Sequence, residues 1–218
     1  MSRSYHLVVF DWEGTLGDTL GQILHIVAAE AKRLHFGDLD LRLARAFVPF
    51  GLFVAVKKIF PQLSTYQHEQ LLEAVQHAVA TEPVKDYLLP GAAEIIKKLH
   101  EAGIALAIAT NKSHSSLQRA LDRLALRPFF MTTRAAGQVP AKPCPQMLEE
   151  IMDVCGVTAT QTLMVGDSVS DIEMAQHIHV DAVGVDFYHQ QADSLRLAGA
   201  TEVFDDYQQL AHYLGLSK

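Results

Sequence analysis

Two carboxylates near the N-terminus, Asp11 and Glu13, are the first candidate reactive residues. Acids two residues apart can act as nucleophile and acid/base, or as ligands of a hard cation. Gly14, directly after them, lets the backbone turn tightly close to a ligand. An acidic turn held by an Asx-type hydrogen bond would show the same residues, so this segment alone leaves both interpretations open.

Two further segments carry groups that bind anions. Thr110-Asn111-Lys112 follows an apolar run and precedes a helical pattern, where a hydroxyl and backbone N–H groups form an anion site. Lys142 is followed by two nearby prolines that stiffen the chain and fix the direction of its ammonium. The structural alternatives are helix capping by Asn111 and an ordinary solvated lysine.

Acidic residues recur after the apolar run at residues 163–165. Asp167 stands beside a glycine at a predicted strand end, from which a carboxylate can reach a hard cation. A carboxylate at a buried strand end also needs a partner. Asp171 opens the next predicted helix, where a helix cap is the structural alternative.

The elements around these residues must place them together. Helical patterns between residues 90 and 178 alternate with short apolar runs, which predicts βαβ units. The predicted fold is therefore α/β, with a doubly wound, Rossmann-like parallel sheet. Sites in such sheets lie beyond the carboxyl ends of strands, where the candidate residues stand. The apolar runs occupy residues 7–10, 104–109, 129–133, 163–165, 182–185 and 202–204.

Apolar side chains at helical spacing fill residues 21–80, which show no convincing strand. We therefore predict an all-α helical cap domain at residues 17–83. It is inserted into an α/β core domain made of residues 1–16 and 84–218. The cap segment at residues 48–52 is interpreted as an inter-helix turn, with a loop that faces the site as the alternative.

The composition of the chain limits the kinds of molecule that it is expected to bind. The net charge of −7 argues against a general nucleic-acid binder, but a metal ion can supply local positive charge for a small phosphorylated metabolite. Two cysteines are too few for a disulfide framework, which favours a cytoplasmic protein. No signal peptide is evident, and no apolar run approaches the ~20 residues that span a membrane. Monomer and homodimer both stay open.

The four motifs together resemble those of the haloacid dehalogenase superfamily, in its phosphoglycolate phosphatase-like branch with a helical cap after the first motif. The resemblance covers nearly the whole chain. The Gly-Thr after the acidic pair is typical of phosphatase members, so a dehalogenase is not expected. The motifs are Asp11-Trp12-Glu13-Gly14-Thr15-Leu16 through Asp18, Ala109-Thr110-Asn111-Lys112, Lys142-Pro143-x-Pro145 and Gly166-Asp167-Ser168-x-x-Asp171.

This resemblance implies a Mg²⁺-dependent phosphatase that acts on a small phosphomonoester, either phosphoglycolate-like or a sugar phosphate. Asp11 would attack phosphorus and form an aspartyl-phosphate. Thr110 and the backbone of Asn111 would bind the phosphoryl oxygens. Lys142 would stabilise charge on the nucleophile and on the transferring group.

The resemblance also implies how the metal is held. Asp11, Asp167 and the backbone carbonyl of Glu13 would be the Mg²⁺ ligands. Asp171 and Ser168 would stand outside the direct ligands, with Asp171 either supporting those ligands or reaching the metal through water. Such residues would speed phosphoryl transfer mainly by positioning the reacting groups and by stabilising their charge.

Glu13 departs from the family pattern, because the phosphatases usually carry Asp there as acid for the leaving oxygen and then base for water. Glutamate adds one C–C bond, roughly 1.5 Å of reach. Misplacement near 1 Å can cost on the order of 100-fold in rate. We therefore expect intact metal binding, modest turnover and a rise in turnover in Glu13→Asp.

Two alternatives to hydrolysis stay open at this point. A phosphoryl-transferring mutase of the beta-phosphoglucomutase type needs an acid/base that suppresses hydrolysis, which Glu13 neither supports nor excludes. A catalytically weakened phosphate-binding regulatory protein would keep the phosphate pocket and lose turnover.

Overall fold

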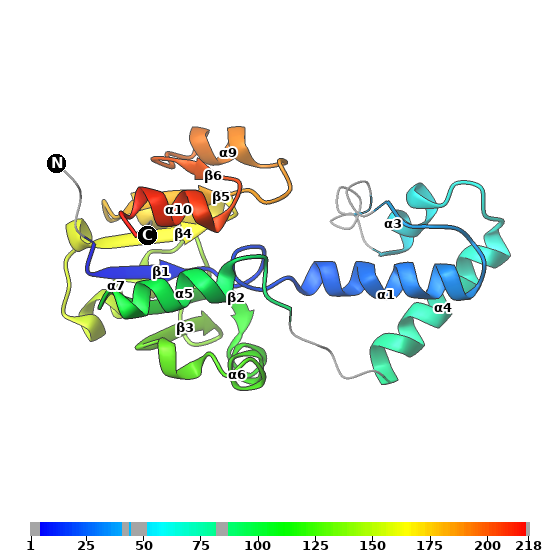
Figure 1. Ribbon diagram of the computed structural model, residues 1–218, viewed down its shortest axis with the longest axis horizontal. Helices are drawn as coiled ribbons and strands as arrows, with labels where there is room; N and C mark the ends of the chain where they lie inside the picture. Colours follow the sequence, from blue (N-terminus) through cyan, green and yellow to red (C-terminus); the bar gives the residue numbers. More distant parts are fainter. Residues whose placement is uncertain (1–4, 41–43, 45–51, 82–86, 217–218) are drawn as a thin grey trace. The chain divides into compact units, whose positions relative to one another are not determined.

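A computed structural model describes residues 5–40, 44, 52–81 and 87–216 of the chain. The chain divides into two compact units, Met1–Gly17 with Leu88–Lys218, and Asp18–Tyr87 (Figure 1). The first unit is an α/β domain and the second is helical. The predicted boundary between residues 83 and 84 lies outside the described residues.

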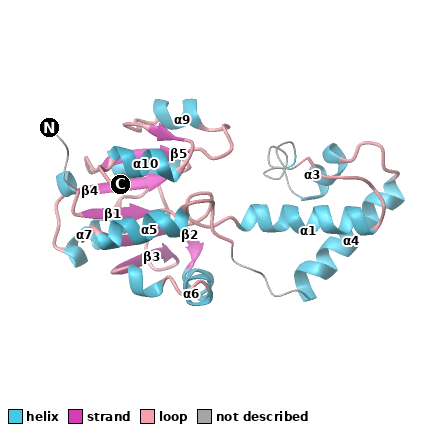
Figure 2. Cartoon of the chain, viewed as in Figure 1, coloured by secondary structure: helices cyan, strands magenta, loops and turns pink. Residues whose placement is uncertain are grey.

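One parallel sheet of six strands forms the centre of the α/β domain (Figure 2). Its strand order, β3-β2-β1-β4-β5-β6, reverses direction at β1 and β4, as in a doubly wound fold. The predicted fold class is therefore confirmed. All four residues of β1 are buried, as expected for a central strand covered on both faces. The strands are β1 Leu7–Phe10, β2 Ala105–Ser113, β3 Thr132–Ala136, β4 Thr162–Gly166, β5 Asp181–Val185 and β6 Val203–Phe204.

Two hydrophobic clusters cover the two faces of this sheet. Alternate residues of each strand point to opposite faces, so Val8 and Phe10 join one cluster while Leu7 and Val9 join the other. The first cluster includes α5, α6 and α10, and the second includes α7, α8 and α9. The helices are α5 Ala92–Glu101, α6 His114–Arg123, α7 Gln146–Cys155, α8 Val169–Gln176, α9 Ala192–Leu197 and α10 Tyr207–Tyr213.

The helical unit has its own small core. Its described helices are α1 (Thr19–Arg33), α3 (Leu52–Ile59) and α4 (Thr65–Thr81). They share a buried apolar cluster that includes Val27, Val56 and Leu71, so the helical spacing seen in the sequence reflects real packing. None of the helices in the described part of the chain is long and apolar enough to cross a membrane. The cap segment at residues 48–52 lies outside the described residues except for its last residue, which begins α3.

One predicted element differs from the structure, and two short helices of the structure were not predicted. The apolar run at residues 129–133 is not one strand, because Arg127–Phe129 is a 3₁₀ turn and β3 begins at Thr132. The ring of Phe129 packs against His100 on α5, at 5.3 Å between ring centres. This contact, and not a place in a strand, accounts for an apolar residue at this position. Helices α9 and α10 were not predicted, since six and seven residues hold too few turns to show a helical period.

Candidate active site

The loop after β1 carries the first acidic pair. The N–H of Asp11 donates to the carbonyl of Val165 at 2.9 Å, which joins this loop to the end of β4. Gly14 has a φ of +77°, in the left-handed region. A Cβ at that position would also lie 2.0 Å from Oδ2 of Asp167. Glycine is therefore required here twice, once for the turn and once to admit a carboxylate from another strand.

A buried ion-pair triad lies at the ends of the central strands. Nζ of Lys142 is 2.6 Å from Oδ1 of Asp11 and 2.5 Å from Oδ1 of Asp171. The exposed fractions of the three side chains are 2%, 9% and 0% for Lys142, Asp11 and Asp171. Burial opposes the charge of Lys142, but the two carboxylates outweigh it and raise the lysine pKa. The lysine is therefore a fixed cation between two acids.

A third carboxylate completes the cluster. Oδ1 of Asp167 accepts a hydrogen bond from the hydroxyl of Thr15 at 3.2 Å. Burial, followed by the charges of Asp11 and Asp171, raises the pKa of Asp167 to about 8. Burial likewise raises the pKa of Asp11 to about 6, against the opposing effect of Lys142. One lysine does not balance the charges of these three acids.

The donor set fits a hard divalent cation. Single carboxylate oxygens from Asp11, Asp167 and Asp171 all lie within 4.8 Å of one another. Oxygen ligands alone suit Mg²⁺ and related ions. A dication would also supply the positive charge that the raised pKa values show to be missing.

The end of β2 brings in the second motif. Thr110 is buried, and its hydroxyl accepts a hydrogen bond from the N–H of Lys112 at 3.2 Å. Oδ1 of Asn111 accepts from the N–H of Lys142 at 3.0 Å. The side chain of Asn111 thus fixes the loop that carries the buried lysine. This contact was not predicted, because the sequence suggested only a backbone contribution to phosphate binding or a helix cap for Asn111.

Asp171 and Ser168 form a capping box at the start of α8. Oδ2 of Asp171 accepts from the Ser168 hydroxyl at 2.7 Å and from its N–H at 3.1 Å, while Oδ1 faces Lys142. A Cβ at Gly166 would lie 2.4 Å from Cβ of Asp171, so the glycine allows this close approach. One carboxylate therefore caps the helix and also anchors the lysine. Asp171 thus lies in one carboxylate cluster with Asp11 and Asp167.

Glu13 stands apart from this cluster. Its carboxylate pairs with the ammonium of Lys112. The Glu13 side chain is 38% exposed, in contrast to the buried triad. The residue expected to act as acid/base thus faces solvent and a lysine to which the sequence gave no role.

Comparison with known proteins decides the family. Residues 8–185 match the family model of the haloacid dehalogenase-like hydrolases. The chain belongs to this family. It is 27% identical over 221 residues to a phosphoglycolate phosphatase of Psychrobacter arcticus, covering 95% of each chain. It is 32% identical to a phosphoglycolate phosphatase of Mesorhizobium japonicum, covering 86% of this chain and 84% of that protein.

Solved structures show the same fold. A haloacid dehalogenase family hydrolase of Deinococcus radiodurans, solved with bound phosphate and sodium, matches with a TM-score of 0.74 at 20% identity. The match covers 98% of each chain. A phosphatase structure from Clostridium difficile, titled as putative, matches with a TM-score of 0.69 at 19% identity, covering 97% of this chain and 99% of that one.

In this hydrolase, a residue near the C-terminus also supports the site. The hydroxyl of Tyr207, on α10, donates to the carbonyl of Thr15 at 2.5 Å. Burial, followed by the charges of Asp167 and Asp11, raises the pKa of Tyr207 well above 10. The sequence offered no motif for Tyr207. Only the rule that a buried tyrosine hydroxyl needs a partner applies to it.

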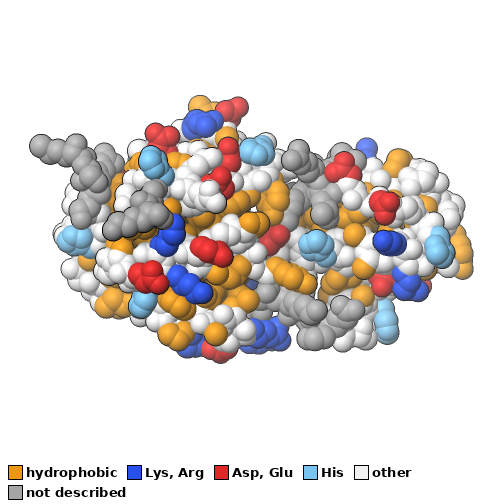
Figure 3. Space-filling model, in the orientation of Figure 1, with side chains coloured by type: hydrophobic (Ala, Val, Ile, Leu, Met, Phe, Trp, Pro, Cys, Tyr) orange, Lys and Arg blue, Asp and Glu red, His pale blue; other side chains and the backbone are white. Residues whose placement is uncertain are grey.

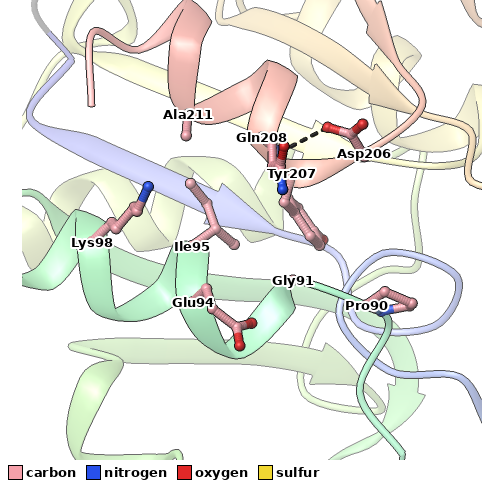
Figure 4. Close-up of a pocket in the computed structure, with 9 residues that line it drawn as sticks. All are labelled: Pro90, Gly91, Glu94, Ile95, Lys98, Asp206, Tyr207, Gln208 and Ala211. Carbon is pink, nitrogen blue, oxygen red and sulfur yellow. Dashed lines mark hydrogen bonds between the residues drawn. The ribbon is translucent and has the colours of Figure 1, made fainter. Parts of the chain in front are cut away.

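A cavity of about 510 Å³ lies on the other side of Tyr207, between α5 and α10 (Figure 4). Its lining contains none of the carboxylates described above. Asp206 at its rim already caps α10 by accepting from the N–H groups of Gln208 and Gln209, at 2.8 Å each. The cavity is therefore separate from the candidate active site. It is lined by Pro90, Gly91, Glu94, Ile95, Lys98, Asp206, Tyr207, Gln208 and Ala211.

Proposed function

We propose that this hydrolase removes the phosphoryl group of a small phosphomonoester through an aspartyl-phosphate on Asp11, with Mg²⁺ as cofactor. One observation carries the proposal: the Asp11 carboxylate lies at the end of β1, paired with buried Lys142 and beside two further carboxylates. A carboxylate at a strand end can attack phosphorus. A fixed ammonium and a divalent cation can offset the charge of the phosphoryl oxygens.

The chain's own residues divide the work as follows. An oxygen of Asp11 forms a bond to phosphorus while the bond to the leaving oxygen breaks. The Thr110 hydroxyl and the Asn111 backbone N–H orient the phosphoryl oxygens, and Lys142 offsets their charge. Glu13 gives its proton to the leaving oxygen, takes one from water, and the resulting hydroxide releases phosphate from Asp11.

Bound Mg²⁺ supplies positive charge at the phosphoryl group and at the nucleophile. We assign its ligands to Asp11, Asp167 and the backbone carbonyl of Glu13. Asp171 lies close enough to join them directly or through water, with Ser168 holding its second oxygen. Support for this assignment comes from the oxygen-only donor set and from the raised pKa values of Asp11 and Asp167.

The substrate we propose is a small phosphorylated metabolite of the phosphoglycolate type, with sugar phosphates as the next candidates. The names of the relatives from Psychrobacter arcticus and Mesorhizobium japonicum support this choice. On the α/β domain face seen in Figure 3, acidic and basic side chains lie interspersed, which suits a small ligand better than a nucleic-acid backbone. We place the protein in the cytoplasm, consistent with its two free cysteines.

Phosphate release from an aryl phosphate, with and without Mg²⁺, tests the proposal. We expect release by the wild type with Mg²⁺, none in Asp11→Asn, and wild-type release in the control Asp193→Asn, whose side chain is 99% exposed. Equal release by Asp11→Asn and wild type would overturn the mechanism. Mg²⁺ and phosphate binding without release would favour the weakened binding protein. Isomerisation of a sugar phosphate supplied with its bisphosphate would favour the mutase.

A further inference from the structure

The ion pair between Glu13 and Lys112 places the acid/base carboxylate on the solvent side of the site. The two side chains are 38% and 17% exposed, whereas Asp11, Asp171 and Lys142 do not exceed 9%. A general acid must come within about 3 Å of the oxygen that it protonates. The leaving oxygen lies across phosphorus from Asp11, and in the structure the carboxylate of Glu13 is paired with Lys112 instead.

The backbone places the two residues near each other. Phe10 of β1 pairs with Ile108 of β2, so the loop after β1 runs beside the end of β2, which continues to Ser113. Glu13 lies three residues beyond the first and Lys112 four beyond the second. The N–H of Lys112 donates to the hydroxyl of the buried Thr110, which ties the lysine backbone to that residue.

The length of Glu13 is what makes the contact. An aspartate at this position would be shorter by one C–C bond, roughly 1.5 Å. Its carboxylate would fall outside hydrogen-bond distance of the same ammonium without a backbone shift. The contact is thus specific to the residue by which this chain departs from the family pattern.

We propose that Lys112 is a positioning residue that holds the Glu13 carboxylate at the solvent side of the site, so that each turnover requires this ion pair to open. The inference rests on the proposed phosphatase function. It gives a physical reason for modest turnover: the acid/base is present but is held by a partner outside the buried cluster. An ion pair of this exposure shifts an equilibrium by about two- to fivefold.

Kinetics of Lys112→Met, Lys112→Arg and the control Lys97→Met test the idea, since Lys97 is an exposed lysine on α5. We expect kcat to rise about two- to fivefold in Lys112→Met and to stay near wild type in the other two. In a Glu13→Asp background, Lys112→Met should leave kcat unchanged. A higher KM at unchanged kcat would mean that Lys112 only attracts the anionic substrate. That result, or a fall in kcat, would overturn the proposal.

A double-mutant cycle in urea unfolding tests the contact without turnover. Glu13→Gln, Lys112→Met and the double variant should give non-additive midpoints, because the two side chains interact. Additive midpoints would overturn the ion pair and the inference with it. If the wild type releases no phosphate at all, the proposed function fails, and the turnover part of the inference fails with it. A non-additive cycle beside inactive wild type would identify that case.

Discussion

Replacing Asp167 by Asn is expected to flatten the pH dependence of stability in the metal-free protein. Burial and the neighbouring Asp11 and Asp171 raise the pKa of Asp167 from 3.8 to about 8. Its carboxyl group therefore keeps its proton to higher pH in the folded protein than in the unfolded chain. The stability contribution is fully present below about pH 4 and is lost as pH rises to about 8.

The size of the effect follows from the same pKa values. A rise from 3.8 to about 8 corresponds to about 6 kcal/mol for a fully desolvated group. Asp167 keeps some contact with solvent, which screens its neighbours and reduces the expected loss between pH 5 and pH 8 to about 2 kcal/mol. Asparagine cannot ionise, but its carbonyl can still accept the hydrogen bond from Thr15.

Urea unfolding with a chelator at several pH values between 5 and 8 measures this difference. The free energy of unfolding of the wild type should fall more steeply with pH than that of Asp167→Asn. Asp193→Asn should follow the wild type, because its carboxylate is exposed. Added Mg²⁺ should restore wild-type stability at pH 8 and have little effect on Asp167→Asn. Parallel curves for wild type and Asp167→Asn would refute the reasoning.

Three other substitutions follow from the same site. Lys142→Met leaves two buried carboxylates without their cation, so thermal unfolding of the metal-free protein should show a loss of about 3–5 kcal/mol that Mg²⁺ partly restores. A loss unaffected by Mg²⁺ would count against a shared metal and lysine site. Tyr207→Phe leaves the Thr15 carbonyl buried without its donor, so it should cost about 1–3 kcal/mol and weaken Mg²⁺ binding measured by calorimetry. Unchanged Mg²⁺ affinity would limit Tyr207 to a folding role. Glu13→Asp should raise kcat on a phosphomonoester, as the sequence predicts and as release from Lys112 explains; a lower kcat would mean that Glu13 suits a differently placed leaving group.

The sheet and the positions of the acidic residues could be predicted because local sequence patterns encode both. Buried parallel strands appear as short apolar runs, and β1 and β4 were placed to within a residue. The carboxyl ends of parallel strands lie at the same edge of the sheet, so Asp11 and Asp167 were expected to lie close together. Gly14 has no side chain and therefore leaves room for the carboxylate of Asp167 beside this loop. These features depend either on residues that are neighbours in the sequence or on the rule that parallel strands end at the same edge of a sheet.

The supporting contacts could not be predicted, because each joins residues that no local pattern relates. Tyr207 and Thr15 are 192 positions apart, and Asn111 reaches Lys142 across 31. The direction in which a side chain points is equally hard to predict from the sequence. Glu13 and Lys112 stood in adjacent motifs, but only the register of β1 against β2 brings them into contact.

The chain passes from the α/β domain to the helical unit and back through two segments that lie side by side. Gly17 and Leu88 form an antiparallel bridge, and the N–H of Leu89 donates to the carbonyl of Leu16 at 2.9 Å. In the α/β domain, the insertion thus takes the place of the loop of a β-hairpin. A two-residue Asn-Gly turn is the connection that such a pair accepts. The α/β domain could therefore be closed at this bridge into a continuous chain without the helical unit.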